Sequence, residues 1–216
     1  CHYALTNNTT ASYNTAVGDR ALDSNVTGNR NTAVGYKALE DTGNGHDNTA
    51  IGYQALDDCA SSNNTAVGSD ALKLNTSGAS NSALGKGALG DNISGGSNTA
   101  IGHNSLGSNT TGNYNVAVGK DALIANTTAA DNVAVGNGAM LANTTGTQNT
   151  ALGTNALDAN TTASFNTALG YQALGSTTTG AQNTAVGRSA MIVNTTGNNN
   201  VAVGMNSLTT STTADN

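Results

Sequence analysis

One asparagine recurs along this chain at nearly constant intervals. Ten of the eleven intervals between successive copies are 17 residues long, and one is 16. A short period that runs through a whole chain predicts a stack of similar units, each burying a face against the next. The recurring asparagines are Asn14, Asn31, Asn48, Asn64, Asn81, Asn98, Asn115, Asn132, Asn149, Asn166, Asn183 and Asn200.

Each asparagine opens one copy of the phrase N-T-A-V-G-x-x-A-L-x-x-N-T-T-G-x-x, whose residues we number as positions 1 to 17. Position 3 is Ala and position 5 is Gly in all twelve copies, position 4 is Val, Ile or Leu, and position 9 is Leu or Met. We therefore expect a single solenoid domain over residues 1–216, with a partial turn at 1–13 and twelve turns over 14–216.

The phrase is typical of short strands rather than of helices. A helical repeat needs about ten or more residues per helix with a 3.6-residue period. The glycines at positions 5 and 15 and the Asn and Thr clusters leave no such run. The expected fold is all-β, a parallel β-solenoid (β-roll) with strands at positions 1–4, 7–9 and 12–14. Glycine at position 5 permits a positive φ or a close backbone approach at a bend.

The composition agrees with a thin core of small side chains. Only 9% of the residues are charged and 3% are aromatic. The formal net charge is −6 and no stripe of Lys or Arg is present, so nucleic acid is not an expected partner. No apolar run approaches the length of a membrane span. Catalysis needs residues of different chemical types at one site. One phrase that repeats from end to end spreads the same residues evenly instead, so we expect no enzyme.

Alternation along a strand separates positions 2 and 4 from position 3. We expect positions 2, 4 and 9 to face the interior, which points position 3 outward. An outward position that is always Ala is either a tight bend that accepts only Ala or a surface where another copy of the chain packs. We favour the second interpretation, which predicts a homo-oligomer of three chains around an axis parallel to the rod. Its interface would comprise Ala16, Ala33, Ala50, Ala66, Ala83, Ala100, Ala117, Ala134, Ala151, Ala168, Ala185 and Ala202.

The two ends of the sequence lack the atypical polar caps that isolated solenoids need. Uncapped ends expose unpaired strand edges, which favour the addition of further strands. We therefore expect that the sequence is a segment of a longer chain or that subunits stack end to end into a filament.

Position 12 is mostly Asn, and nine of these residues begin the N-x-S/T acceptor pattern for N-glycosylation. Sites about 4.8 Å apart cannot all carry glycans, so a ladder of hydrogen-bonded amides is the favoured interpretation. Glycosylation at a few outward sites is the alternative, and Asn7 and Asn63 begin the same pattern. The nine candidates are Asn8, Asn25, Asn75, Asn92, Asn109, Asn126, Asn143, Asn160 and Asn194.

Four carboxylates occupy positions 10 and 11 of adjacent turns, namely Glu40, Asp41, Asp57 and Asp58. They suggest a Ca²⁺ site, because Ca²⁺ prefers several oxygen ligands. The favoured alternative is a solvated acidic corner that Lys73 in the next turn partly neutralises. We expect no other cofactor.

The remaining residues with reactive or recognition chemistry are scattered. His2, His46 and His103 are too far apart for a zinc site or a catalytic triad. Tyr36 and Tyr53 share position 6 of adjacent turns, and they predict a stacked pair that is either surface decoration or a platform for a sugar.

The two cysteines are not expected to form a disulfide within one chain. Cys1 and Cys59 are three turns apart, roughly 14 Å at the turn spacing. A disulfide needs Cα atoms within about 7 Å. Cys1 remains a candidate for a bond between subunits or for lipidation.

The phrase N-T-A-V-G-x-x-A-L resembles the head repeats of trimeric autotransporter adhesins and related repeats of phage tail fibres and surface fibres. The resemblance covers essentially the whole chain, and A-V-G is its most specific part. It implies left-handed parallel β-rolls that pack as trimers and bind matrix or host surfaces. The repeat here is longer than the usual adhesin-head unit, and a neck, a coiled-coil stalk and a membrane-anchor barrel are missing from the sequence.

The leading functional expectation is an extracellular structural fibre or adhesin shaft, on a cell or virion surface, built by self-association. A glycan-binding or surface-binding module is the alternative. Ice binding is a minor alternative, because ladders of Thr can order water.

Overall fold

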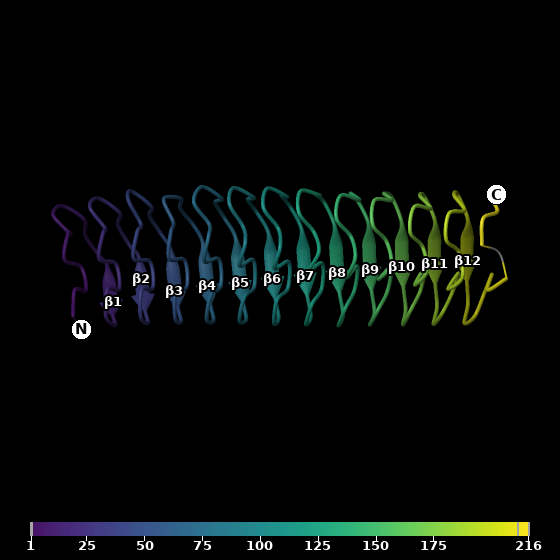
Figure 1. The fold of residues 1–216 in the computed structure, drawn as a ribbon, viewed down its shortest axis with the longest axis horizontal. Helices are drawn as coiled ribbons and strands as arrows, with labels where there is room; N and C mark the ends of the chain where they lie inside the picture. The colour runs from purple at the N-terminus through teal and green to yellow at the C-terminus, as the bar shows by residue number, and fades with distance from the viewer. Residues whose placement is uncertain (1, 211, 216) are drawn as a thin grey trace.

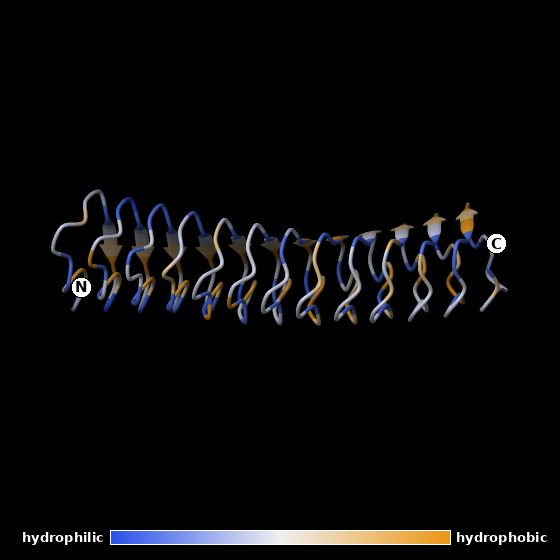
Figure 2. Cartoon of the chain, turned by 90° about the horizontal axis from the view of Figure 1, so that it is seen from above, coloured by the Kyte–Doolittle hydropathy of each residue, from blue (hydrophilic) through white to orange (hydrophobic). Residues whose placement is uncertain are grey.

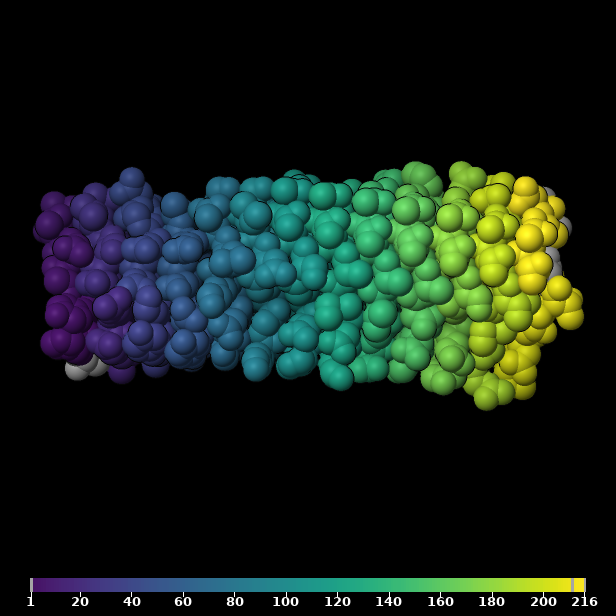
Figure 3. All heavy atoms as spheres, viewed as in Figure 1, coloured from purple at the N-terminus to yellow at the C-terminus, as the bar shows by residue number. Residues whose placement is uncertain are grey.

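The computed structural model describes residues 2–210 and 212–215, which form one elongated β-solenoid (Figure 1). Each turn contributes one three-residue strand, and the twelve strands form a single parallel sheet in sequence order. Figure 3 shows that the side chains of successive turns close into one continuous rod. The strands are β1 (Thr15–Val17), β2 (Thr32–Val34), β3 (Thr49–Ile51), β4 (Thr65–Val67), β5 (Ser82–Leu84), β6 (Thr99–Ile101), β7 (Val116–Val118), β8 (Val133–Val135), β9 (Thr150–Leu152), β10 (Thr167–Leu169), β11 (Thr184–Val186) and β12 (Val201–Val203).

Every strand pairs in register with the next one, so equivalent residues stand above each other. Ala16 pairs with Ala33 at one end of the sheet, and Ala185 pairs with Ala202 at the other. The 16-residue copy keeps this register, because Thr49 still pairs with Thr65. The missing residue is therefore absorbed outside the strand, and the predicted parallel solenoid with 17-residue turns is confirmed.

The core lies between the strands and the segment that follows them in each turn. It consists of Ala from position 3, Ala from position 8, and Leu or Met from position 9. Leu106 and Leu123, for example, have no exposed surface. The large side chains therefore come from one wall only, and both walls contribute Ala, which keeps the core thin.

The predicted assignment of the strand faces is wrong. Positions 2 and 4 point outward, and position 3 points into the core of its own chain. The position 3 side chains are buried in the same cluster as the Leu column, where a larger side chain would overpack the core, and this accounts for an invariant Ala. Most of the proposed interface residues are thus buried within one chain and cannot contact another copy, while Ala16 is partly buried. The buried ones are Ala33, Ala50, Ala66, Ala83, Ala100, Ala117, Ala134, Ala151, Ala168, Ala185 and Ala202.

Only the segment at positions 2–4 is a strand, and the predicted strands at positions 7–9 and 12–14 are turns and bends. The reason is a left-handed backbone at positions 7, 9 and 17, as in Arg20 (φ 57°), Leu22 (φ 52°) and Arg30 (φ 58°). Such φ values are uncommon outside glycine and bend the chain sharply. The glycine at position 5 was correctly predicted, because it has a φ between 121° and 143° in every turn.

The asparagines of position 1 form a ladder that runs through the stack. The side-chain Oδ1 of Asn98 accepts the backbone N–H of Asn115 at 2.9 Å, and its Nδ2 donates to the carbonyl of Gly112 at 2.8 Å. The same two bonds recur in turn after turn, with Asn81 holding Asn98 in the same way. Position 1 therefore needs a buried side chain that both donates and accepts, which is the chemistry of an amide.

Position 12 supplies a second amide ladder, as favoured from the sequence. Nδ2 of Asn109 donates to Oδ1 of Asn92 at 2.8 Å, and Nδ2 of Asn126 donates to Oδ1 of Asn109 at 2.9 Å. The ladder is interrupted where the position is not Asn. Thr177 donates onward to the carbonyl of Asn194, which leaves the buried Oδ1 of Asn160 without a partner.

Candidate functional site

The outward side of the strands carries the most extensive uniform surface of the rod, which we call the T-x-V face. It consists of the side chains at positions 2 and 4 of β1 to β12. Position 2 is Thr, Ser or Val and position 4 is Val, Leu or Ile, so the face contains no charged residue. Leu84 is 50% exposed and Val17 is 51% exposed. The position 4 column comprises Val17, Val34, Ile51, Val67, Leu84, Ile101, Val118, Val135, Leu152, Leu169, Val186 and Val203.

The size of the T-x-V face is unusual for a surface that meets only water. Twelve strands at a spacing of about 4.8 Å extend over roughly 53 Å. With a width of about 11 Å, two residue rises plus the breadth of the side chains, the face covers on the order of 600 Å². This is the size of the largest exposed patches on monomeric proteins, and here the position 4 column is apolar while the position 2 column is mostly Thr. Such patches commonly mark a binding surface.

The margins of the T-x-V face differ from the face itself. Position 6 on one side varies from turn to turn and includes Tyr36, Lys86 and Arg188, and position 17 on the other side includes Arg30 and Asp131. An uncharged centre of aliphatic and hydroxyl side chains with a polar, varied rim is a composition typical of an association surface. Figure 2 also shows that the strands turn gradually about the long axis of the rod, so the face is twisted rather than flat.

The structure places most of the predicted glycosylation sites inside the molecule. Asn25, Asn75, Asn92, Asn109, Asn126, Asn143 and Asn160 have no exposed surface, and Asn194 is 1% exposed. Their side-chain nitrogens donate to the preceding turn or to the carbonyl three residues further on, as in Asn109 and Asn194. This burial supports the amide ladder, which was the favoured interpretation, over glycosylation at these residues. Asn8 is partly exposed, and Asn7 and Asn63 are exposed, so the prediction remains open there.

The four carboxylates considered for Ca²⁺ are not brought together as a ligand set. Lys37 and Arg20 approach the Glu40 carboxylate at 2.7 Å and 3.2 Å, and they neutralise it. Burial raises the pKa of Glu40, but these two partners outweigh burial and leave that pKa below its usual range. Burial and the nearby charge of Glu40 raise the pKa of Asp57 to about 6, which opposes a role as a cation ligand.

The remaining two members, Asp41 and Asp58, are exposed and are joined to each other through their backbones. Within residues 2–210 and 212–215, no group of His, Cys, Asp and Glu side chains is arranged to hold a metal ion. The region is an acidic corner, but Lys37 and Arg20 neutralise Glu40 there, and Lys73 pairs instead with Asp70.

The tyrosine pair at position 6 is stacked as predicted. The ring centroids of Tyr36 and Tyr53 are 5.4 Å apart and the rings are inclined by 15°. Both residues are partly exposed at the margin of the T-x-V face. Cys59 is a buried free thiol whose pKa is raised by burial. Cys1, the candidate for an intersubunit bond or lipidation, lies outside the described residues.

Comparisons with known proteins do not assign this chain to a family. No protein-family model matches the chain, and neither a curated protein nor a solved structure matches it. The described part of the chain also contains no apolar helix of membrane-spanning length. The geometry of the rod is therefore the basis for any statement about function.

Proposed function

We propose that this chain is a structural shaft of an extracellular fibre, in which copies associate through the T-x-V face around an axis parallel to the rod. The observation that carries the proposal is the uncharged exposed face that runs the whole length of the sheet beside two variable polar margins. Rods that lie side by side bury this face completely, whereas a compact ligand would cover only a few turns.

The area of the face fits a stable assembly. Two copies that bury about 600 Å² each remove roughly 1,200 Å² from water, which is the lower limit of specific protein interfaces. Three chains around one axis would let each face contact two neighbours, and the gradual turning of the strands in Figure 2 would let the chains wind around each other. We therefore retain three chains as the proposed number.

A structural role also agrees with the way each rod is held together. The position 1 ladder satisfies buried backbone groups in every turn, and the backbone hydrogen bonds between turns repeat along the rod. Stability that adds up over neighbouring turns gives stiffness and resistance to proteolysis without a large globular core. The proposal assigns no catalytic residue, and it places the fibre on a cell or virion surface.

Ice binding is the less favoured use of the same surface. Thr at position 2 does form an exposed column, but Figure 2 shows that the strands turn about the rod axis. Equivalent threonines therefore do not share one plane over the length of the rod, as a flat ice lattice would require.

The proposal predicts that one charge at the centre of the T-x-V face weakens the assembly. Ile101→Asp places a carboxylate on this face, at a residue that is 39% exposed. Burying it against another copy would leave an unpaired charge in the interface, which costs several kcal/mol, roughly 3–5. We expect sedimentation equilibrium to give an oligomer for the wild type and a shift toward monomer of at least about 100-fold in dissociation constant for the variant.

The matched control is Leu141→Asp, because Leu141 is 44% exposed but lies at position 10, on the other wall of the rod. It should leave the oligomer mass unchanged, and both variants should keep the circular dichroism of the wild type. A wild-type chain that stays monomeric at micromolar concentration, or an equal effect of the two variants, would contradict the proposal.

A further inference from the structure

A notch interrupts the wall opposite the strands, where two consecutive turns carry glycine instead of larger side chains. Gly90 and Gly107 occupy position 10, which elsewhere holds residues such as Ile124 and Leu141. Gly87 also leaves position 7 of its turn without a side chain. The result is an open surface hollow of about 580 Å³, which has room for a small ligand that stays partly exposed to water.

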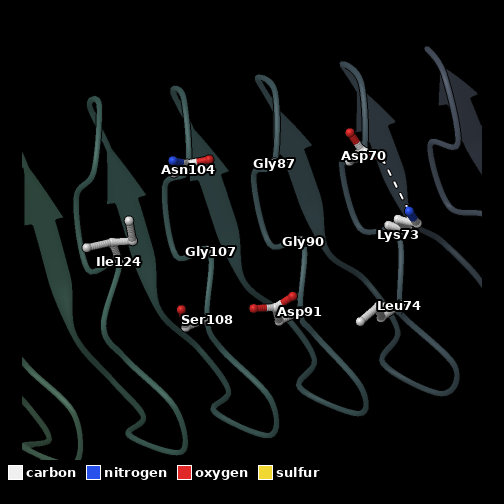
Figure 4. Close-up of a pocket in the computed structure, with 10 residues that line it drawn as sticks. All are labelled: Asp70, Lys73, Leu74, Gly87, Gly90, Asp91, Asn104, Gly107, Ser108 and Ile124. Atoms are coloured by element: carbon white, nitrogen blue, oxygen red, sulfur yellow. Dashed lines mark ion pairs between the residues drawn. The ribbon is translucent and has the colours of Figure 1, made fainter.

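Figure 4 shows how side chains from four turns surround this notch. Leu74 and Ile124 provide apolar surface toward its two ends, and Asp91, Asn104 and Ser108 line the middle. The backbone of Gly90 and Gly107 lines the hollow between them, and the Asn104 side chain lies over Gly87. The site thus combines apolar ends with convergent polar groups, which is the pattern expected for a ligand site.

The polar groups in the middle of the notch have hydrogen-bonding capacity to spare. Within the described residues the side chains of Asp91, Asn104 and Ser108 make no hydrogen bond or ion pair, and Asp91 is exposed while Asn104 and Ser108 are partly exposed. This contrasts with the asparagines of the ladders, whose amides are committed to neighbouring turns. Together these three side chains offer a carboxylate acceptor, an amide that both donates and accepts, and a hydroxyl.

The charge of the notch selects against anionic ligands. Lys73 lies 3.6 Å from the Asp70 carboxylate and also donates to Gln54 at 3.0 Å, so its charge is largely engaged. Asp91 then leaves the notch with a net negative charge. A ligand with several hydroxyl groups and no negative charge fits these groups best, because hydroxyls both donate to a carboxylate and accept from an amide.

We propose that the notch between Leu74 and Ile124 binds a short neutral oligosaccharide. The notch spans three turn spacings, about 14 Å, which suits a ligand of a few linked rings rather than a single small molecule. The sugar hydroxyls would meet Asp91, Asn104 and Ser108, while the apolar faces of the rings would lie against Leu74 and Ile124. In Figure 4 the strands lie behind the labelled side chains, so the notch stays open when the T-x-V face is covered.

Filling the notch provides the decisive variant. The double change Gly90→Leu and Gly107→Leu restores side chains of the kind that Leu141 and Ile124 carry at position 10, so the fold should tolerate it. We expect the wild type to bind neutral oligosaccharides on an array that also carries sialylated and sulfated ones. The filled variant should lose at least about 90% of that signal, because its leucines occupy the ligand volume.

Gly175→Leu is the matched control, since Gly175 also occupies position 10 but lies outside the notch. Its binding signal should equal that of the wild type. Asp91→Asn and Asn104→Ala should each weaken binding about tenfold, the loss of one net hydrogen bond. No binding to any neutral glycan, binding only to anionic glycans, or equal binding by the filled variant and the wild type would overturn the proposal.

The outcome is separable from that of the assembly proposal. Ile101→Asp changes the oligomer mass but leaves the notch intact, and the filled variant changes the notch but leaves the T-x-V face intact. Glycan binding by the Ile101→Asp chain therefore tests the notch even where assembly fails. The affinity of one chain for one glycan is the quantity to compare, because a monomer loses the multivalent binding of an oligomer.

Discussion

Alanine in place of Gly119 is expected to destabilise the fold by about 4 kcal/mol, through backbone strain and overpacking together. Gly119 has a φ of 132°, which L side chains rarely adopt. A Cβ at this residue would lie 2.5 Å from the carbonyl oxygen of Gly136 in the next turn, far inside the contact distance. The neighbour is backbone in a tightly stacked ladder, so it cannot move aside without opening the turns.

Chemical denaturation monitored by circular dichroism measures this effect, and Gly90→Ala is the control. Gly90 lies at a position where other turns carry side chains, and its nearest neighbour to an added Cβ is 3.3 Å away. Its substitution should change the free energy of unfolding by less than about 1 kcal/mol. Equal stability of the two variants would show that the bend does not require glycine.

Replacing Asn98 by alanine is expected to cost about 2 kcal/mol, because the buried N–H of Asn115 loses its acceptor at roughly 1–3 kcal/mol. The change removes the acceptor for the N–H of Asn115 and the donor to the carbonyl of Gly112. The N–H of Asn115 is distant from water, since Asn98 is 1% exposed and Asn115 is fully buried. The carbonyl of Gly112 keeps a second donor, because Nδ2 of Asn109 donates to it at 3.0 Å. Hydrogen exchange should accelerate first at the amide of Asn115.

The opposite change is available where the second ladder is broken. Thr177→Asn should restore a donor to the orphaned Oδ1 of Asn160 and raise stability by about 1 kcal/mol. A ladder that contributes only packing would give Asn98→Ala the small cost of a lost side chain, with no acceleration at Asn115. It would also give no gain for Thr177→Asn.

The period of the sequence predicted the architecture because stacking is a consequence of repetition. Residues that recur every 17 positions must fall on the same line when each copy completes one turn. The register, the bend at position 5 and the amide ladder of position 12 all follow from that single requirement. The one 16-residue copy did not disturb the prediction, because the loop rather than the strand absorbs the deletion.

The orientation of the strand could not be obtained from the same pattern. Alternation states that positions 2 and 4 share a side, but it does not state which side faces the core. Hydrophobicity favoured Val and Leu inside, as for Val118 and Leu84, whereas a side chain larger than Ala would overpack the core beside the Leu column. The path of the chain around the core depends on left-handed corners at residues such as Arg20 and Leu22. These corners could not be predicted from the sequence, because Arg and Leu rarely adopt a positive φ.

The invariance of position 3 was nevertheless a sound signal of burial. It indicated one buried face of the strand, and the exposed apolar column at position 4 is the surface through which we propose that chains associate. The notch could have been found by aligning position 10 alone, since Gly90 and Gly107 follow each other in that column. The sequence could not show that three unpartnered polar side chains converge there.

The most direct test of the account is cross-linking between chains at position 4. Ile51 and Leu169 lie on β3 and β10, equally far from the two ends of the sheet, and are 41% and 40% exposed. All variants carry Cys1→Ser as a common background. In an assembly of parallel chains, the variant Ile51→Cys should form disulfides between copies of itself, and so should Leu169→Cys. The control Leu141→Cys, on the other wall, should form none. Disulfides only between the Ile51→Cys and Leu169→Cys variants in a mixture would indicate antiparallel chains, and efficient cross-linking at Leu141→Cys with none at position 4 would contradict assembly through the T-x-V face.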